Sequence, residues 1–349
     1  RLSSTYYKVR VGGDAAMVKG IMKSLLSLHN EALSKGEKGV IDEAFIAEHT
    51  QGFEELKADL EATDWADIER VSGLSHKDIL HIARLYAKAE RTILCYGMGI
   101  TQHQYGTKNV QQLANLMLMR SNIGKKGAGI CPLRGHSNVQ GDRTVGITEI
   151  PNQALLDGIE RTFGFTPPTK HGHGAVATIR AMHEGKAKAL FCLGGNLPVA
   201  MPEPETCFEG MRKLDLAVHM ATKLNRSHLA VAKHTYLFPV IGRTERDTQL
   251  SGDQSVTVED SMSMVHASRG SLEPASPHLK SEPALVAALA KASLPNTVVP
   301  WDKLVSDYHF IRDAIESVFP AFKDFNKRIM NHGGFRLYNA ASERRSEER

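Results

Sequence analysis

Apolar residues recur every three or four positions in several stretches of the chain, the spacing of one helix face. The first stretch starts at Asp14, which we expect to cap the helix. Three more helices are predicted before the first strand: one after Asp42, one across Phe53–Arg70 with a break near Thr63 and Asp64, and one that Ser75 caps, with Asp78 three residues later as in a capping box. A further pattern, Thr107–Arg120, carries apolar and methionine residues on one side and predicts a core-packed helix.

Two short apolar runs share one layout and predict strands. TILCYGMG (Thr92–Gly99) and KALFCLGGNLP (Lys188–Pro198) both pass through apolar residues and a cysteine and then reach glycine. Two more strands are expected at Leu214–Met220 and Thr235–Val240. We interpret the two similar runs as the leading strands of two related lobes, and two strands of one sheet remain the alternative.

The order helix, strand, glycine-rich loop and helix is typical of nucleotide-binding α/β folds. We therefore predict an α/β fold class with two Rossmann-like lobes, each a doubly wound and mostly parallel sheet. The length of 349 residues favours more than one domain. The predicted division is a first lobe at residues 1–136, a second lobe at 137–270, and a helical or irregular connector at 271–349.

Composition narrows the function only slightly. A hydrophobic content of 42% and a charged content of 23% are ordinary for a globular protein. The net charge of +4 and the lack of a basic tract argue against nucleic-acid binding. The sequence has no apolar run long enough to span a membrane.

The four cysteines have no C-x-x-C pairing, so they do not predict a zinc or iron-sulfur site. Cys95 and Cys192 lie in apolar runs and are expected to be buried. Few cysteines favour reduced thiols and a cytoplasmic location. His171 and His173, in FTPPTKHGHG, are interpreted as a surface loop rather than a metal site.

The segment CPLRGHSNVQGD, Cys131–Asp142, is polar and punctuated by glycine, which predicts a fixed loop where ligands bind. Arg134 supplies a forked, permanent cation, and Asn138 and Gln140 supply amides that donate and accept. These groups suit a planar, anionic or heteroaromatic ligand. The alternative is a polar connector whose amides satisfy only backbone groups.

The run from Tyr96 to Gln140 resembles the alpha subunits of formate dehydrogenases, in the large dimethyl sulfoxide reductase family. That family carries molybdenum on two molybdopterin guanine dinucleotides. Its G-(V/I)-T-Q loop, helix, GNIG(K/R)xGAG turn and RGQNNVQG loop have counterparts here in the same order. A looser resemblance extends from Val11 to about Asn339.

The resemblance implies roles for individual residues. Arg134 matches the arginine that neutralises and orients formate, and His136 stands where the family has glutamine, so it could move a proton or change which anion is favoured. The residues that the resemblance places near the cofactor are Gly97, Gly99, Thr101, Gln102, Gly135, Asn138, Gln140, Gly141, Gly194, Gly195, Asn196, Thr222 and Asn225.

The resemblance also implies parts outside this chain. The family's molybdenum ligand and its 4Fe-4S cluster lie upstream of the matched region, so no metal-ligating residue is expected here. The end of the sequence resembles the lead into a final β-barrel domain. We therefore expect a central fragment, inactive alone, of an enzyme that oxidises formate or a similar small molecule and has an electron-transfer partner.

The sequence departs from the family pattern in three places. Ser137 and Asn138 replace a pair of asparagines, and DRTVG replaces the family's ACDMG. The segment Gly242–Ser261 replaces an E-x-D-G-T-x-x-N pattern, and its residues Arg243, Glu245, Arg246 and Asp247 are expected to form an ion-paired surface. These departures favour a side branch of the formate-dehydrogenase-like proteins.

Two other functions remain open at this point. One is a degenerate, non-catalytic relative that binds a nucleotide or pterin. The other is an NAD dehydrogenase, which is disfavoured because Gln102 stands where the third glycine of G-x-G-x-x-G would be.

Overall fold

The computed structural model describes residues 3–133 and 135–337, which form two compact units. Of these residues, 3–136 (without 134) and 261–263 belong to the first unit. Residues 137–260 and 264–337 belong to the second. The domain boundaries expected from the sequence stay a prediction.

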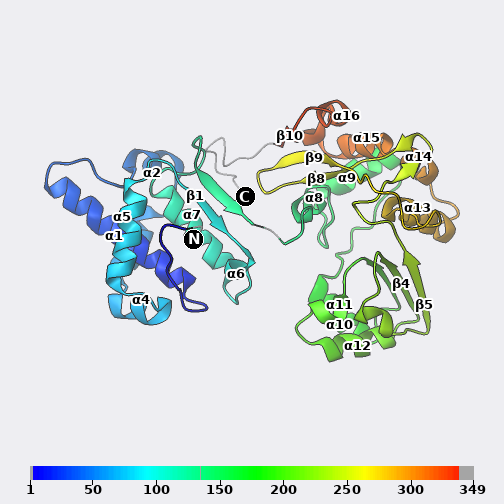
Figure 1. Cartoon of the computed structure of the whole chain (residues 1–349), viewed down its shortest axis with the longest axis horizontal. Helices are drawn as coiled ribbons and strands as arrows, with labels where there is room; N and C mark the ends of the chain where they lie inside the picture. The colour runs from blue at the N-terminus through cyan, green and yellow to red at the C-terminus, as the bar shows by residue number, and fades with distance from the viewer. Residues whose placement is uncertain (1–2, 134, 338–349) are drawn as a thin grey trace. The chain divides into compact units, whose positions relative to one another are not determined.

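The first unit packs helices around a long central one and carries a short parallel sheet (Figure 1). Its elements are α1 (Asp14–Ser34), α2 (Glu43–His49), α3 (Phe53–Ala62), α4 (Trp65–Ser72), α5 (His76–Lys88), β1 (Ile93–Tyr96), α6 (Met98–Thr101), α7 (Gly106–Leu118) and β2 (Gly129–Pro132). Apolar residues of α1, among them Ile21, Met22 and Leu25, are buried in its core. Each buried side chain of this size stabilises the fold by roughly 1.5–3 kcal/mol.

The helix starts follow their sequence signals, with one exception. The Ser75 hydroxyl accepts a hydrogen bond from the Asp78 amide (3.2 Å), so the predicted cap is confirmed. The predicted capping by Asp14 is wrong, because Gly13 is the N-cap and Asp14 is the first helical residue. A side chain at Gly13 would lie 2.5 Å from the Val71 carbonyl oxygen. Asp14 therefore favours the helix through its charge in the first turn.

The second unit contains a parallel sheet in the order β3-β4-β5. Its strands are β3 (Ala189–Leu193), β4 (Leu216–Ala221) and β5 (His234–Pro239). Helices α10 (Ala175–His183) and α12 (Pro204–Arg212) lie on one face of this sheet (Figure 1) and form a core with it through Met182, Met211 and Ala217. The predicted α/β fold class is confirmed, and the two similar apolar runs lie in separate sheets.

The rest of the second unit is an antiparallel sheet with helices. The remaining elements are α8 (Val139–Thr144), α9 (Gln153–Phe163), α11 (Leu197–Ala200), η1 (Arg226–Leu229), β6 (Thr248–Gln249), β7 (Gly252–Asp253), β8 (Val256–Glu259), β9 (Met264–Ser268), α13 (Glu282–Ser293), α14 (Trp301–Ser306), α15 (His309–Val318), η2 (Pro320–Phe322), α16 (Phe325–Arg328) and β10 (Phe335–Arg336). Strands β8 and β9 form a hairpin, and β10 pairs with β9. Across residues 3–133 and 135–337, every helix is too short or too polar to cross a bilayer.

Three sequence expectations need correction. The strand predicted at Thr92–Gly99 ends at Tyr96, and a helical turn follows. The segment Cys131–Asp142 is not loop throughout, because its start completes β2 and its end begins α8. Cys95 is exposed, since alternate residues of β1 point to opposite faces, whereas Cys192 is half-buried and burial raises the pKa of its thiol.

Candidate functional site

In the first unit, the carboxyl ends of two parallel strands bring two predicted ligand loops together. Strand β1 pairs with β2, and the Leu133 amide donates to the Tyr96 carbonyl oxygen at 2.7 Å just beyond the strands. Gly97 follows β1, and Gly135 follows β2 after a short interval. A side chain at Gly135 would lie 2.9 Å from the Met98 sulfur, so the two loops are in close approach. Ligands of parallel α/β sheets bind at this edge.

The loop after β1 presents an open backbone edge. A Cβ at Gly97 or Gly99 would meet no atom within 4 Å, and both glycines line a pocket of about 350 Å³ with His103 and residues 9–12. This open edge fits a large ligand that approaches the backbone closely. Thr101 and Gln102 are exposed next to it.

The same loop is anchored from its other side. The buried Asn109 amide donates to the Ile100 carbonyl oxygen at 3.0 Å. A side chain at Gly106 would lie 2.2 Å from the Thr101 carbonyl oxygen, so glycine permits the turn to pack directly on α7. The loop is therefore fixed before any ligand arrives, which lowers the entropic cost of binding.

Of the two residues predicted to be catalytic, the structure describes His136. Arg134 lies outside the described residues, and its role stays a prediction. His136 is exposed, and nothing in its surroundings tests a proton-transfer role.

In the second unit, the amides of the predicted ligand segment are held by one glutamate. Asn138 accepts a hydrogen bond from the Glu259 amide at 3.0 Å, and the Gln140 amide donates to the Glu259 carboxylate. Glu259 is buried, with 4% of its surface exposed. A Cβ at Gly141 would lie 2.0 Å from the Asn138 side-chain oxygen, which explains glycine at that position. These contacts give the segment a definite shape, and its role in cofactor binding stays a prediction.

The β3-β4-β5 sheet has a second glycine edge. Gly194 and Gly195 follow β3 with φ angles of 65° and 76°, a conformation that favours glycine, and a Cβ at either would meet open space. Asn196 accepts from the Ser227 amide and hydroxyl at 3.2 and 3.1 Å. Asn225 donates to the Gly195 carbonyl oxygen at 2.7 Å.

Thr222 is exposed at the end of β4, the strand next to β3. The structure thus brings four residues predicted from the β3 and β4 loops to one edge of the sheet: Gly194, Gly195, Asn196 and Asn225. The open backbone and exposed hydroxyl at this edge fit a nucleotide-like group.

A histidine pair lies behind this edge. His219, on β4, is 2% exposed, and its ring meets that of His228 edge-on with 5.0 Å between centroids. His228 accepts a hydrogen bond from the Asn225 amide at 3.1 Å. Burial, and to a smaller extent the neighbouring His228, lower the pKa of His219. The pair supports the loop that carries Asn225.

The segment Gly242–Ser261 does not form the predicted ion-paired surface as a whole. Arg246 does pair with Glu273. Arg243 instead donates to the hydroxyls of Ser137 (2.6 Å) and Ser268 (3.3 Å), and Glu245 accepts from the Gly242 and Ala275 amides. Arg243 and Glu245 thus have uncharged partners, because the loop lies next to Ser268 of β9 and Ala275.

Two residues that hold the predicted ligand segment, Arg243 and Glu259, were not assigned that position from the sequence. Both lie in the segment that lacks the family pattern, and both contact residues 137–140. Their distance along the chain from Ser137 and Gln140 hid the contacts. Among the described residues, no group of three His, Cys, Asp or Glu side chains could hold a metal ion.

Comparison with known proteins identifies the family. The model of the molybdopterin oxidoreductases matches residues 9–233, which is more than half of the chain. The chain belongs to the molybdopterin oxidoreductase family. The matched residues include the glycine edges of both parallel sheets. Membership of this family implies a molybdenum-molybdopterin cofactor.

Relatives in bacteria cover nearly the whole chain. Protein YdeP of Escherichia coli O6:H1 is 58% identical over 345 residues, which are 99% of this chain and 46% of that protein. The uncharacterized oxidoreductase Rv2900c of Mycobacterium tuberculosis is 39% identical over 96% of this chain and 43% of its own length. The chain thus spans less than half the length of these relatives.

More distant proteins share less. The putative formate dehydrogenase YrhE of Bacillus subtilis is 30% identical over 55% of this chain and 20% of that protein. The acetylene hydratase of Pelobacter acetylenicus superposes with a TM-score of 0.59 at 18% identity, over 94% of this chain and 44% of that one. At this identity the similarity concerns the fold alone.

Proposed function

We propose that this chain is the cofactor-binding part of a molybdenum oxidoreductase whose cofactor is a pair of molybdopterin guanine dinucleotides. The observation that carries the proposal is the open glycine edge at the carboxyl end of each parallel sheet. Gly97 and Gly99 in one unit, and Gly194 and Gly195 in the other, leave backbone accessible to a ligand. Two such edges suit a cofactor that is present in two copies.

The proposed reaction is the two-electron oxidation of a small anion, with formate as the first candidate. Oxidation of formate breaks its C–H bond and yields carbon dioxide, one proton and two electrons. The bound cofactor would supply the electron-accepting chemistry, and an electron-transfer partner would then take both electrons. Arg134 would bind the carboxylate in two places and stay charged at working pH. His136, two residues further along the chain, would take the proton.

A second candidate is a non-oxidative or non-catalytic relative. It is favoured by His136 and Ser137, which replace the amides of the formate dehydrogenase pattern. The fold is also shared with a protein named as a hydratase, so the fold does not decide the reaction.

The first experiment is elemental analysis of the full-length protein, purified from a host that makes the molybdenum cofactor. We expect about one molybdenum atom and two guanine nucleotides per chain. A formate-dependent dye reduction assay then tests the substrate. Protein without molybdenum and without nucleotide would refute the oxidoreductase proposal, whereas loaded protein that reduces no dye with formate would redirect the search to other small anions.

A further inference from the structure

Two of the three regions in which this chain departs from the formate dehydrogenase pattern are in contact. Ser137 replaces an asparagine of the family loop, and Arg243 belongs to the segment that replaces E-x-D-G-T-x-x-N. The Arg243 Nη1 atom lies 2.6 Å from the Ser137 hydroxyl oxygen. The Ser137 hydroxyl oxygen accepts from the Arg243 guanidinium, so the two departures are chemically compatible.

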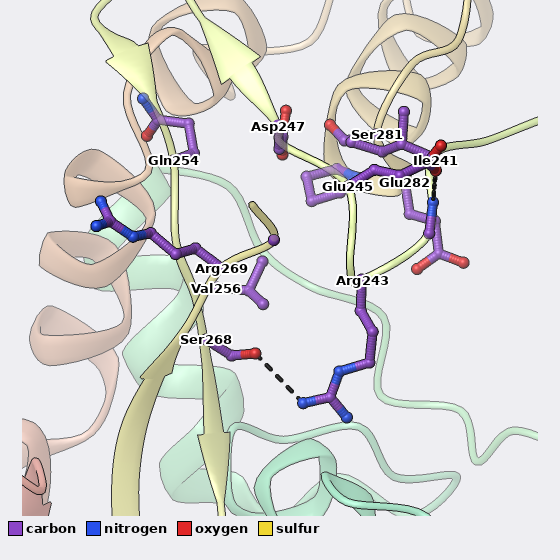
Figure 2. Close-up of a pocket in the computed structure, with 13 residues that line it drawn as sticks. Ile241, Arg243, Glu245, Asp247, Gln254, Val256, Ser268, Arg269, Ser281 and Glu282 are labelled. Carbon is purple, nitrogen blue, oxygen red and sulfur yellow. Dashed lines mark hydrogen bonds between the residues drawn. The ribbon is translucent and has the colours of Figure 1, made fainter. Parts of the chain in front are cut away.

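The second arm of the guanidinium is also used. Arg243 Nη2 lies 3.3 Å from the Ser268 hydroxyl oxygen, at the end of β9, and Figure 2 shows the side chain extending toward Ser268. A planar guanidinium presents several N–H donors in fixed directions, so it can hold two oxygens at once. Arg243 thereby ties Ser137 to β9.

The other strand of the hairpin holds the next residues. Glu259, at the end of β8, accepts from Gln140 through its carboxylate and donates its amide to Asn138. Residues 137–140 are therefore fixed by a glutamate on β8 and by an arginine that is itself fixed on β9. The segment begins three residues after Arg134 in the chain.

Arg243 also lines a pocket of about 130 Å³. The two arginines of this pocket do not converge on a common point, because the Arg269 side chain extends away from Arg243 in Figure 2. The pocket therefore does not have the geometry of an anion site. Glu245, Asp247 and Glu282 line the same pocket, and their carboxylates would repel a bound anion. The geometry favours a role for Arg243 in holding the chain over direct binding of a ligand.

We infer that Arg243 is a positioning residue that sets the shape of the segment after Arg134, with Ser137 as its target. The inference rests on the proposed function, in which Arg134 binds a small anionic substrate. Fixing the chain next to a binding residue raises the fraction of molecules that are ready to bind. Loss of this tether, the contact between Arg243 and Ser137, should therefore raise the KM for the anion more than it lowers kcat.

The test uses the full-length protein with the variants Arg243→Met, Arg243→Lys, Ser137→Ala and the Arg243→Met/Ser137→Ala double variant. Arg269→Met is the matched control, an exposed arginine of the same pocket. Hydrogen exchange of peptides covering 135–142 is measured first. Removing Arg243 should speed exchange about 2- to 10-fold, the range for an exposed charge-assisted hydrogen bond. The Lys variant should restore part of the protection.

The double variant separates a direct contact from a general effect. If Arg243 acts through Ser137, the amides of residues 135–142 should exchange no faster in the double variant than in the faster of the two single variants. Multiplying effects, or exchange as slow as in the Arg269→Met control, would overturn the inference. If the full-length protein oxidises formate, KM and kcat are then measured for each variant. An unchanged KM with a reduced kcat in Arg243→Met would also contradict the inference.

The outcomes distinguish this inference from the proposed function. Protein that lacks molybdenum and guanine nucleotide refutes the proposed function, while the exchange experiment still measures the tether. Loaded protein with unchanged exchange in the Arg243→Met variant refutes the tether alone.

Discussion

The side-chain amide of Asn225 donates a hydrogen bond to the carbonyl oxygen of Gly195, with 2.7 Å between the two atoms. The loop after β4 thereby holds the loop after β3, and Asn196 reciprocates by accepting from Ser227. Asn225 also caps the short helix η1 through the Ser227 amide at 2.9 Å. One side chain thus fixes both loops at this edge of the sheet, so its removal should have a measurable cost.

Asn225→Ala should lower the free energy of unfolding by about 1–2 kcal/mol, because it removes a helix cap and a hydrogen bond to a loop carbonyl. Asn225→Asp keeps the cap oxygen but loses the donor to Gly195, so its cost should be smaller. Urea denaturation followed by circular dichroism measures both. An Asn225→Asp variant as stable as the unsubstituted protein would show that the contact with Gly195 contributes nothing, and equal losses in the two variants would show the same of the cap.

Gly99→Ala should separate cofactor binding from folding. A Cβ at Gly99 meets no protein atom within 4 Å, so the melting temperature of the cofactor-free chain should change by less than about 2 °C. If the cofactor lies against this backbone, the full-length variant should lose much of its guanine nucleotide. Gly172→Ala, at an exposed loop outside the site with its nearest atom 3.5 Å away, is the control. Full nucleotide content in both variants would place the cofactor elsewhere.

Much of the fold was readable because its signals are local. Helix α5 follows the cap at Ser75, and the break near Thr63 and Asp64 separates α3 from α4. Strand β3 lies within its predicted range. Periodicity and capping act within a few residues, so a sequence displays them directly.

Elements whose formation depends on a distant partner were missed. Strand β2 is four residues long and ends at Pro132, so only its pairing with β1 makes it a strand. The hairpin of β8 and β9 had a readable signal in the alternation of VTVE and MVHAS, but its polar turn is not a two-residue type. The same distance dependence hid the contacts of Arg243 and Glu259 with residues 137–140. The glycine edges were predicted through the resemblance, and their openness required the structure.

Tyr308→Phe should destabilise the second unit by about 1–3 kcal/mol, because the change removes the hydrogen bonds of a buried hydroxyl, one of them to a carboxylate. Tyr308 is 3% exposed, and its hydroxyl donates to the Asp247 carboxylate and lies 2.8 Å from the Ser281 hydroxyl. Burial is the main cause that raises the pKa of Tyr308, so the hydroxyl stays a donor in the working pH range. Tyr105→Phe, at a residue that is 58% exposed, is the control and should cost almost nothing. Chemical denaturation compares them, and equal stabilities would argue against a buried network.

His219 gives the fold a pH dependence whose sign can be stated. Its Nε2 atom is buried and has no hydrogen-bond partner among the described residues. Burial, followed by the neighbouring His228, lowers its pKa below the ordinary value of 6.5. Above this value the ring is neutral in both the folded and the unfolded chain. Below it the unfolded chain takes up a proton that the folded chain resists, so the stability falls as the pH decreases.

The predicted slope is at most about 1.4 kcal/mol per pH unit between 6.5 and the lowered pKa, because a single proton is involved. His219→Gln should remove this part of the pH dependence, whereas His228→Gln should only reduce it, since burial remains. His171→Gln, at an exposed histidine far from β4 in the chain, should follow the unsubstituted protein. Urea denaturation at pH 7.5, 6.5 and 5.5 measures the slopes. If His219→Gln keeps the original slope, the destabilisation at acid pH arises from other groups, and folding does not lower the pKa of His219.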